Sequence, residues 1–352
     1  MNEPANRIAK LCLVLALCAT AAASSFALAA KKKKQQSSDE HTPVRCYDVD
    51  VHGGAAFLAQ TLGLSVWDVA DPLRPRATER LALPTTVYGV TAEPPRLYLA
   101  GGGHGLYVAE LDEDGAPQVV SRFNTPGSVR QVLRLEHYAL LADERHGLLV
   151  VDISDATRPL QKARIPTRDE MLSLALQGTL LATAEKSAGV RLFDLSRPER
   201  PLELQVVREV RDARDVAFVD GLLVVAGGQA GLFVYRLDDQ GRTSRVGSLE
   251  IDRSANHVAG DRGVVLVSNG TPALQLIRLD ASGRPTLLAP LRVHRFAPAW
   301  RVHVRGERAF AAIDEAGISI IDLKDPDMPE VLLPRTRRFE ISYPGSDFDD
   351  QR

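Results

Sequence analysis

Cysteine is scarce in this chain of 352 residues, which contains only Cys12, Cys18 and Cys46. The first two fall in an N-terminal segment that we expect to be removed, and a lone cysteine cannot form an internal disulfide. The sequence therefore excludes the small secreted folds that depend on a disulfide framework. Folding has to rest on the hydrophobic core.

An excess of charge is also lacking, because 43 basic residues stand against 45 acidic ones and the formal net charge is −2. A nearly neutral chain offers no electrostatic footprint for nucleic acid, so we expect no nucleic-acid partner. Helical patterning is missing as well, since no stretch keeps apolar residues at i, i+3, i+4 and i+7 over a dozen positions.

At the N-terminus an apolar run from Leu11 to Leu17 follows two basic residues and precedes small residues that end in Ala27-Leu28-Ala29. This order is typical of a secretory signal peptide, so we predict cleavage near Ala29 or Ala30. The run is too short for a transmembrane helix, which needs about 20 apolar residues. A lipoprotein signal at Cys18 is disfavoured because the residue before it is not small.

The rest of the chain contains a repeated motif in which a small residue precedes alternating apolar residues that in four copies end in Asp. The copies are GLSVWDV from Gly63, GLYVAEL from Gly105, GLLVVDI from Gly147, GVRLFDL from Gly189, GLFVYRL from Gly231, ALQLIRL from Ala273 and GISIIDL from Gly317. Successive copies are 42 residues apart five times and then 44 residues apart. A fixed period of this length is typical of repeat architectures.

Each period contains four short segments rich in Val, Leu, Tyr and Phe, which in the second copy are residues 88–92, 97–100, 106–111 and 119–123. Gly, Pro, Asp or Asn separates the segments, and this punctuation predicts strands. A four-stranded unit with two apolar faces cannot bury both alone, so neighbouring units must stack. The sequence therefore predicts an all-β fold, a seven-bladed β-propeller of four-stranded repeats of about 42 residues.

Four regions follow from these patterns: a signal peptide over residues 1–30, a disordered Lys-rich tether over 31–44, the propeller over 45–337 and a C-terminal tail over 338–352. The tether is almost free of apolar side chains, which is the composition of a disordered segment. How the ring closes stays open. Either side chains of the first and last blades pack together, or the segment 339–343 adds a strand.

The segments GLLVVDISDATRP, GLSVWDVADPLRP and GISIIDLKDPDMP resemble the LVIVD repeat, and the resemblance covers about residues 46 to 336. It implies a secreted or surface-associated bacterial propeller, in a family mostly without assigned activity. The resemblance thus implies location and architecture rather than a reaction. The Asp-Pro sequences after the motif are explained as turns, in which Pro presets the backbone and Asp bonds ahead of it.

The innermost strand of each blade is expected to place polar residues at the mouth of a central channel. Apolar anchors recur in these strands at Val49, Val90, Val132, Leu172, Val216 and Val302. The residues next to the anchors in the seven periods are Asp48, Gly89, Gln131, Ser173, Asp215, His257 and Arg301. Four of them, Asp48, Asp215, His257 and Arg301, belong to consecutive blades and are our candidate ligand-binding residues. They could orient a polar ligand, bind a cation weakly or hold a water; alternatively, they are solvated channel residues, with Arg301 paired to an Asp.

The connections between blades, and those between the second and third strands, are expected on one face of the propeller. Loops on a rigid scaffold carry function more often than the scaffold does. The candidates on these loops are His104, His146, Arg168, Asp169, Arg211 and Arg295. Two of them, His104 and His146, occupy the same position in adjacent repeats, but two histidines are too few for a zinc site. The sequence indicates no catalytic residue, no metal site and no cofactor.

These observations favour a binding or interaction scaffold, because the fold is common and no residue pattern points to a chemistry. We expect a monomer, periplasmic or associated with the cell surface, with a protein or cell-envelope partner. Two alternatives stay open. One is a propeller hydrolase or lactonase-like enzyme with a polar site at the channel, and the other is a structural component of the envelope.

Overall fold

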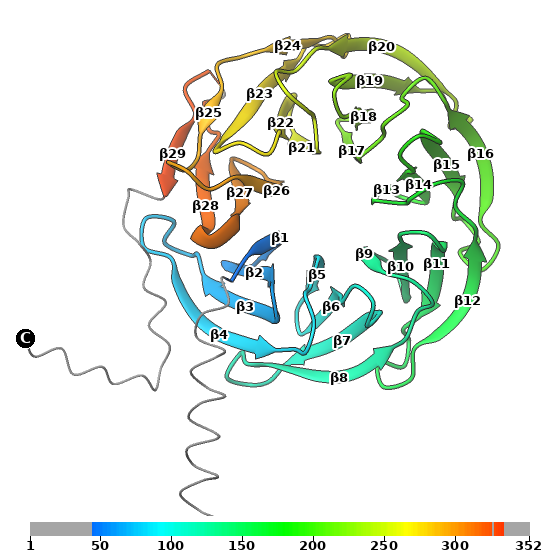
Figure 1. Cartoon of the computed structure of the whole chain (residues 1–352), viewed down its shortest axis with the longest axis vertical. Helices are drawn as coiled ribbons and strands as arrows, with labels where there is room; N and C mark the ends of the chain where they lie inside the picture. The colour runs from blue at the N-terminus through cyan, green and yellow to red at the C-terminus, as the bar shows by residue number, and fades with distance from the viewer. Residues whose placement is uncertain (1–43, 326, 334–352) are drawn as a thin grey trace, which may run out of the picture. The chain divides into compact units, whose positions relative to one another are not determined.

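The computed structural model describes residues 44–325 and 327–333, which form a ring of seven blades around a central channel (Figure 1). Each blade is an antiparallel sheet whose strands follow chain order, and we call them a to d from the channel outward. This arrangement confirms the predicted all-β, seven-bladed β-propeller. The predicted signal peptide, the tether up to residue 43 and the predicted tail lie outside the described residues.

Blade one comprises β1 (Cys46–His52), β2 (Ala55–Gln60), β3 (Gly63–Asp68) and β4 (Arg76–Ala82). Blade two comprises β5 (Gly89–Glu93), β6 (Arg96–Ala100), β7 (Leu106–Leu111) and β8 (Pro117–Phe123). Blade three comprises β9 (Val129–Leu135), β10 (Tyr138–Asp143), β11 (Gly147–Asp152) and β12 (Leu160–Ile165). Blade four comprises β13 (Ser173–Gln177), β14 (Leu180–Ala184), β15 (Val190–Asp194) and β16 (Leu202–Val207). Blade five comprises β17 (Asp215–Val219), β18 (Leu222–Ala226), β19 (Leu232–Leu237) and β20 (Thr243–Leu249). Blade six comprises β21 (His257–Asp261), β22 (Val264–Ser268), β23 (Ala273–Leu279), β24 (Pro285–Leu287) and β25 (Leu291–Arg292). Blade seven comprises β26 (Ala299–Arg305), β27 (Arg308–Ile313), β28 (Gly317–Asp322) and β29 (Glu330–Leu333), with a 3-10 turn at Asp314–Ala316. The strands of blade two differ from the predicted ranges by at most two residues at an end.

The middle strands of a blade are buried on both faces. Every residue of β10 is buried, whereas the outer strand β4 alternates exposed and half-buried residues. The apolar clusters lie between blades rather than within them: one joins Tyr98 and Leu106 of blade two to Val132 and Leu149 of blade three. A blade thus buries its apolar faces only against its neighbours, as the repeat argument requires.

The small residue of the motif is glycine in six copies because the backbone there has a positive φ, from +81° to +133°. At Gly147 an added Cβ atom would lie only 2.1 Å from the carbonyl oxygen of Ile165 on the outer strand. Both the backbone conformation and the close approach therefore require glycine at the start of strand c.

Blade six departs from the predicted four continuous strands. Its motif begins with Ala273 instead of glycine, and its outer strand is split into β24 and β25, which both pair with β23. Pro290 lies between the two pieces. Because proline has no N–H to donate, it cannot continue the ladder and accounts for the break.

In blade four the register differs from the one predicted by the anchors. Ser173 pairs with Ala184, as Asp48 pairs with Ala59 in blade one. The anchor of blade four is therefore Leu174, and the choice of Leu172 was wrong. A shift of two residues keeps every side chain on the same face of a strand, so the hydrophobic pattern could not separate the two registers.

The first and seventh blades close the ring through side chains. One apolar cluster joins Trp67 of blade one to Phe310 and Ile318 of blade seven. Arg45 adds an ion pair with Asp314, with 3.7 Å between Nε and Oδ1. Across the described ranges, no strand is shared between two blades. Within these residues, the ring is closed by side chains that pack between blades one and seven. The alternative segment 339–343 lies outside the described residues.

The d-to-a and b-to-c connections lie on the same face of the ring, which we call the loop face. Backbone bridges join these connections between neighbouring blades, namely Gly102 with Val129, Lys186 with Ala213 and Gly228 with Ala255. The opposite face carries the a-to-b and c-to-d turns, including the Asp-Pro turns, and we call it the turn face.

Candidate functional site

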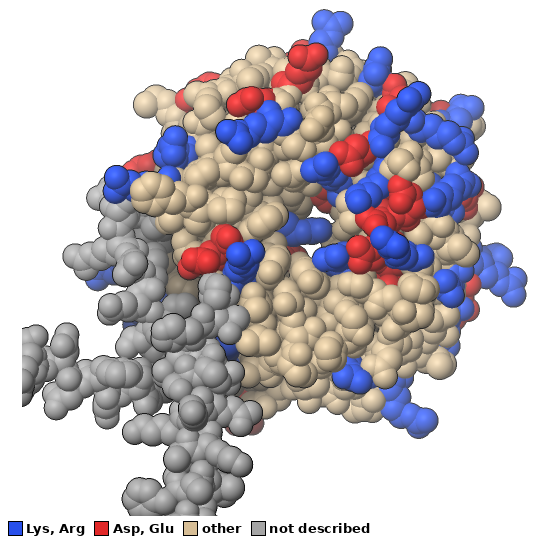
Figure 2. Space-filling model, viewed as in Figure 1, with Lys and Arg blue, Asp and Glu red and all other residues tan. Residues whose placement is uncertain are grey.

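The central channel forms a cavity of about 1050 Å³ that is lined by the a strands of all seven blades. Small-molecule sites commonly have roughly 300–1,000 Å³, so the cavity has room for a ligand. All four channel candidates, Asp48, Asp215, His257 and Arg301, line it. The lining also includes Pro94, in an a-to-b turn, so the cavity extends to the turn face. Figure 2 shows the hole at the centre of the ring.

Polar side chains in the channel connect each a strand to the next blade. Strand a is an edge strand, whose outward N–H and C=O groups have no partner in their own sheet. Four such N–H groups donate to a side chain of the preceding blade over 2.8 to 3.1 Å: Val90 to Asp48, Ala92 to Asp50, Leu174 to Gln131 and Val258 to Asp215. Thr91 donates to the Val132 carbonyl over 2.6 Å, and His257 Nε2 lies 3.1 Å from the Val302 carbonyl oxygen. We call these contacts inter-blade staples, and they give three of the four channel candidates a structural role.

Asp215 and His257 form the most enclosed polar pair of the channel. Asp215 accepts hydrogen bonds from the Ser173 hydroxyl and from the Val258 N–H, and it forms an ion pair with His257 Nδ1. Burial alone would raise the pKa of Asp215, but His257 and the hydrogen bonds outweigh burial and hold that pKa below its usual range.

Both ring nitrogens of His257 face acceptors, a carboxylate at Nδ1 and a carbonyl at Nε2. Both nitrogens are thus engaged within the protein. Neither nitrogen is free to take a proton from a substrate, so His257 is placed to orient Asp215 rather than to act as a general base. Ser173 bonds Asp215 and not the histidine, which differs from the order of contacts in a nucleophilic triad.

Asp48 has the opposite electrostatic environment. Burial raises its pKa, and the charge of Arg301 only partly offsets that effect. No ion pair joins Arg301 to either aspartate within the described part of the chain, although its charge lowers the pKa of both. The sequence suggested that Arg301 pairs with an Asp. Arg301 instead acts on both aspartates as a nearby charge, without direct contact.

Sequence reasoning missed two further residues on the strand of Arg301. His303 and Arg305 also line the cavity, because residues two apart on a strand point to the same side. His303 forms an ion pair with Asp50, with 3.4 Å between Nε2 and Oδ1. The alternation Arg-Val-His-Val-Arg over residues 301–305 was the signal that could have found them.

The six loop candidates have different environments. His104 is half-buried in the b-to-c turn of blade two, and His146 lies 3.9 Å from the Asp143 carboxylate in the corresponding turn of blade three. Arg211 and Arg295 are exposed in d-to-a connections. The remaining two candidates, Arg168 and Asp169, belong to a charged network.

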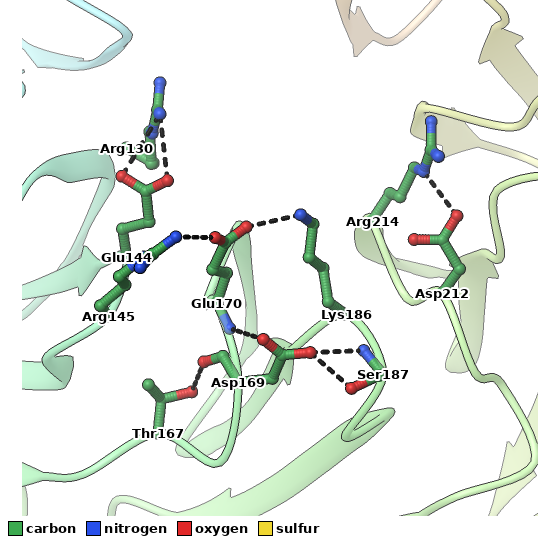
Figure 3. Close-up of polar contacts among 10 residues, drawn as sticks. All are labelled: Arg130, Glu144, Arg145, Thr167, Asp169, Glu170, Lys186, Ser187, Asp212 and Arg214. Atoms are coloured by element: carbon green, nitrogen blue, oxygen red, sulfur yellow. Dashed lines mark hydrogen bonds and ion pairs between the residues drawn. The ribbon is translucent and has the colours of Figure 1, made fainter.

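This network spans the loop face of blades three to five (Figure 3). Its ion pairs are Arg130 with Glu144 (3.2 Å), Arg145 with Glu170 (2.8 Å), Lys186 with Glu170 (2.5 Å) and Arg214 with Asp212 (2.8 Å). Asp169 accepts the Ser187 N–H over 3.1 Å. The hydrogen bonds from Lys186 and Arg145 lower the pKa of Glu170, and the bond to Glu170 raises the pKa of Lys186. In Figure 2, charged side chains gather over the inner strands of these blades, whereas the region over blade two shows few.

A buried charge pair supports the network from below. The guanidinium of Arg191 contacts Glu185 at 3.0 Å and Glu203 at 2.6 Å, and Glu185 is fully buried. Glu185 accepts the N–H of Arg168 over 3.0 Å, while Arg191 donates to the Pro166 carbonyl over 3.0 Å. These contacts fix the d-to-a connection that carries Arg168 and Asp169.

No group of three or more metal-ligating side chains occurs among the residues that the structure describes. Within the same residues, no helix is long and apolar enough to span a membrane.

A ring of seven four-stranded blades, with a polar channel and a charged loop face, defines the chain as a seven-bladed β-propeller. Residues 126–167, which contain blade three, match the model of the LVIVD repeat. The chain is an LVIVD-repeat β-propeller.

Two solved structures share the fold. The crystal structure of the computationally designed Ika8 protein has a TM-score of 0.59 and 8% sequence identity, and the alignment covers 79% of this chain and 96% of that one. A chain of the crystal structure of the Mitotic Checkpoint Complex has a TM-score of 0.63 and 15% identity, with 76% and 83% covered. Similarity at these identities shows the fold alone. No curated protein matches this chain.

Proposed function

We propose that the protein is an exported binding scaffold, in the periplasm or at the cell surface, that holds a protein partner on its loop face. The charged network of blades three to five carries this proposal. It lies on loops of three adjoining blades, and loops on a fixed scaffold are the usual place of binding residues.

Stability alone does not account for this network. Exposed ion pairs contribute about 0–1 kcal/mol each, so a cluster of them adds little to the free energy of unfolding. The side chain of Arg145 is 77% exposed in its ion pair with Glu170. Alternating charges on a fixed surface instead favour one partner over others, because like charges in juxtaposition are costly. The expected partner is a protein with a complementary pattern of charges.

A charge-reversal variant tests the proposal. The double variant Arg145→Glu, Arg211→Glu changes two exposed arginines of the loop face. The matched control, Arg74→Glu, Arg158→Glu, makes the same change of net charge in two Asp-containing turns of the turn face. Each full-length protein is used to capture partners from a native periplasmic extract, and the captured proteins are quantified by mass spectrometry.

We expect the parent and the turn-face control to capture the same partner, and the loop-face variant to lose most of it. Equal capture by all three proteins, or loss only in the turn-face control, contradicts the proposed face. Absence of any partner that is specific to the parent contradicts the scaffold itself.

The alternative of a hydrolase or lactonase-like enzyme would need a free acid or base in the channel. His257 and Asp215 are both engaged within the protein, so the geometry supports binding better than proton transfer. A structural role in the envelope predicts co-sedimentation of the protein with membrane or cell wall, which separates that alternative from a soluble periplasmic scaffold.

A further inference from the structure

The acidic groups of the channel all have partners within the protein. Asp48 accepts the N–H groups of Val49 and Val90, and Asp50 accepts those of Val51 and Ala92 and pairs with His303. Asp215 contacts Ser173, Val258 and His257. Glu93 pairs with Arg134, and Glu110 pairs with Arg96. Because these carboxylates are engaged, none of them offers a free pair of oxygens to a cation that enters the channel.

Two arginines of the same cavity differ from these carboxylates. Within the described residues, the side chains of Arg301 and Arg305 form no hydrogen bond or ion pair, yet both residues line the cavity. Arg301 is half-buried, and Arg305 is exposed. A guanidinium carries five N–H donors in a fixed fork, so these two side chains present unused donors on permanent cations to the channel.

The three basic side chains of β26 form one row along the channel. Arg301, His303 and Arg305 alternate with two valines, and residues two apart on a strand are about 6.6 Å apart. An anion lying along this strand could contact Arg301 at one end and Arg305 at the other.

Space for such an anion comes from small residues on the other inner strands. The a strands of blades four to six carry alanine at the level of His303, as their register with the b strands shows. These residues are Ala175, Ala217 and Ala259, and all three line the cavity. Short side chains there leave the volume in front of β26 free.

We propose that the channel binds a small organic anion that carries carboxylate or phosphate oxygens, held by the guanidinium groups of Arg301 and Arg305. Planar guanidinium matches either oxyanion with two parallel hydrogen bonds, which is a stronger interaction than one between neutral groups. This site is separate from the protein-binding loop face, so either proposal can fail without the other.

Isothermal titration calorimetry of the full-length protein tests the inference, with citrate and inorganic phosphate as probes at constant ionic strength. We expect saturable binding of at least one probe at one site per chain. Arg301→Gln and Arg305→Gln are each expected to weaken binding about tenfold, the effect of losing a hydrogen bond between charged groups. Tighter binding of citrate than of phosphate would identify a carboxylate ligand, and the reverse order a phosphate ligand.

The matched control is Arg122→Gln, which removes an exposed arginine of the outer strand β8 and should bind as the parent does. If Arg301→Gln does not fold, Arg305→Gln decides, because that side chain is exposed. Absence of saturable binding of both probes overturns the inference. Equal weakening in the Arg122 variant, or saturable binding of calcium without binding of either anion, does so as well.

Discussion

His303 of the last blade and Asp50 of the first blade form an ion pair across the point where the ring closes, with 3.4 Å between Nε2 and Oδ1. Asp50 also accepts the N–H of Ala92 in blade two over 2.8 Å. One carboxylate on β1 thus contacts both neighbouring blades. The closing interface uses the same kind of inter-blade contact that joins the other blades around the channel.

Removing a large side chain at the closing interface should destabilise the whole propeller. Phe310 is 5% exposed and lies in the apolar cluster shared by blades one and seven. We expect Phe310→Ala to lower the free energy of unfolding by about 3–5 kcal/mol, the usual effect of a buried Phe to Ala change. Urea denaturation measures the change. Phe296→Ala, at a side chain 74% exposed, should have little effect, and equal effects of the two variants would contradict closure by packing.

Neutralising Asp215 should destabilise the protein in a way that depends on pH. Asp215→Asn leaves His257 without its carboxylate, and loss of one partner of a buried pair costs about 3–5 kcal/mol near neutral pH. The folded-state pKa of Asp215 is lowered, so the stabilisation is present above the ordinary carboxyl pKa of about 3.9 and is lost as pH falls through the lower folded pKa. Urea unfolding at a series of pH values should show the difference from the parent shrinking below about pH 4.

The control for this series is Asp239→Asn, at an exposed carboxylate of the c-to-d turn in blade five. It should leave the unfolding free energy nearly unchanged across the same pH range. A difference for Asp215→Asn that stays constant down to strongly acid pH would show that Asp215 is not held ionised by His257.

The glycine of the motif should not tolerate a side chain. In Gly147→Ala the new Cβ atom would meet the Ile165 carbonyl oxygen at 2.1 Å, and residues with a side chain are disfavoured at positive φ by about 1–2 kcal/mol. Gly178→Ala provides the control, because its φ is +59° but nothing lies within 4 Å of the added atom. We expect the Gly147 variant to lose clearly more unfolding free energy in urea than the Gly178 variant. Equal losses would mean that backbone conformation alone selects the glycine.

The N-terminal segment makes a separate prediction. If the signal peptide is removed on export, the intact mass of the protein from the periplasmic fraction should correspond to a chain that begins near Ala30 or Lys31. Size-exclusion chromatography of that material should give the elution of a monomer. Retention of the leader in the exported protein would contradict the predicted cleavage.

Much of the architecture could be predicted from the sequence, because a propeller repeats one local pattern and the period places every blade. The same period placed Asp48, Asp215, His257 and Arg301 in one channel, which the structure shows as a shared cavity. The use of Asp48, Asp215 and His257 as inter-blade staples could not be predicted, since it depends on the alignment of one blade with the next. The buried pair of Arg191 and Glu185 was missed for a related reason. Charged residues near a loop are usually solvated, whereas this pair is enclosed by residues that come together only in the folded protein.

The interface between blades one and seven is the one that no chain connection crosses, yet it is built from the same kinds of contact as the others. Its apolar cluster and its Asp50 ion pair hold together two segments that lie at opposite ends of the described sequence. The ring is therefore held at this interface by non-covalent contacts and not by a chain connection. A circular permutant that joins the old ends and opens instead between blades two and three, within residues 124–128, should assemble the same seven blades, because cuts in surface loops are tolerated when the contacts persist.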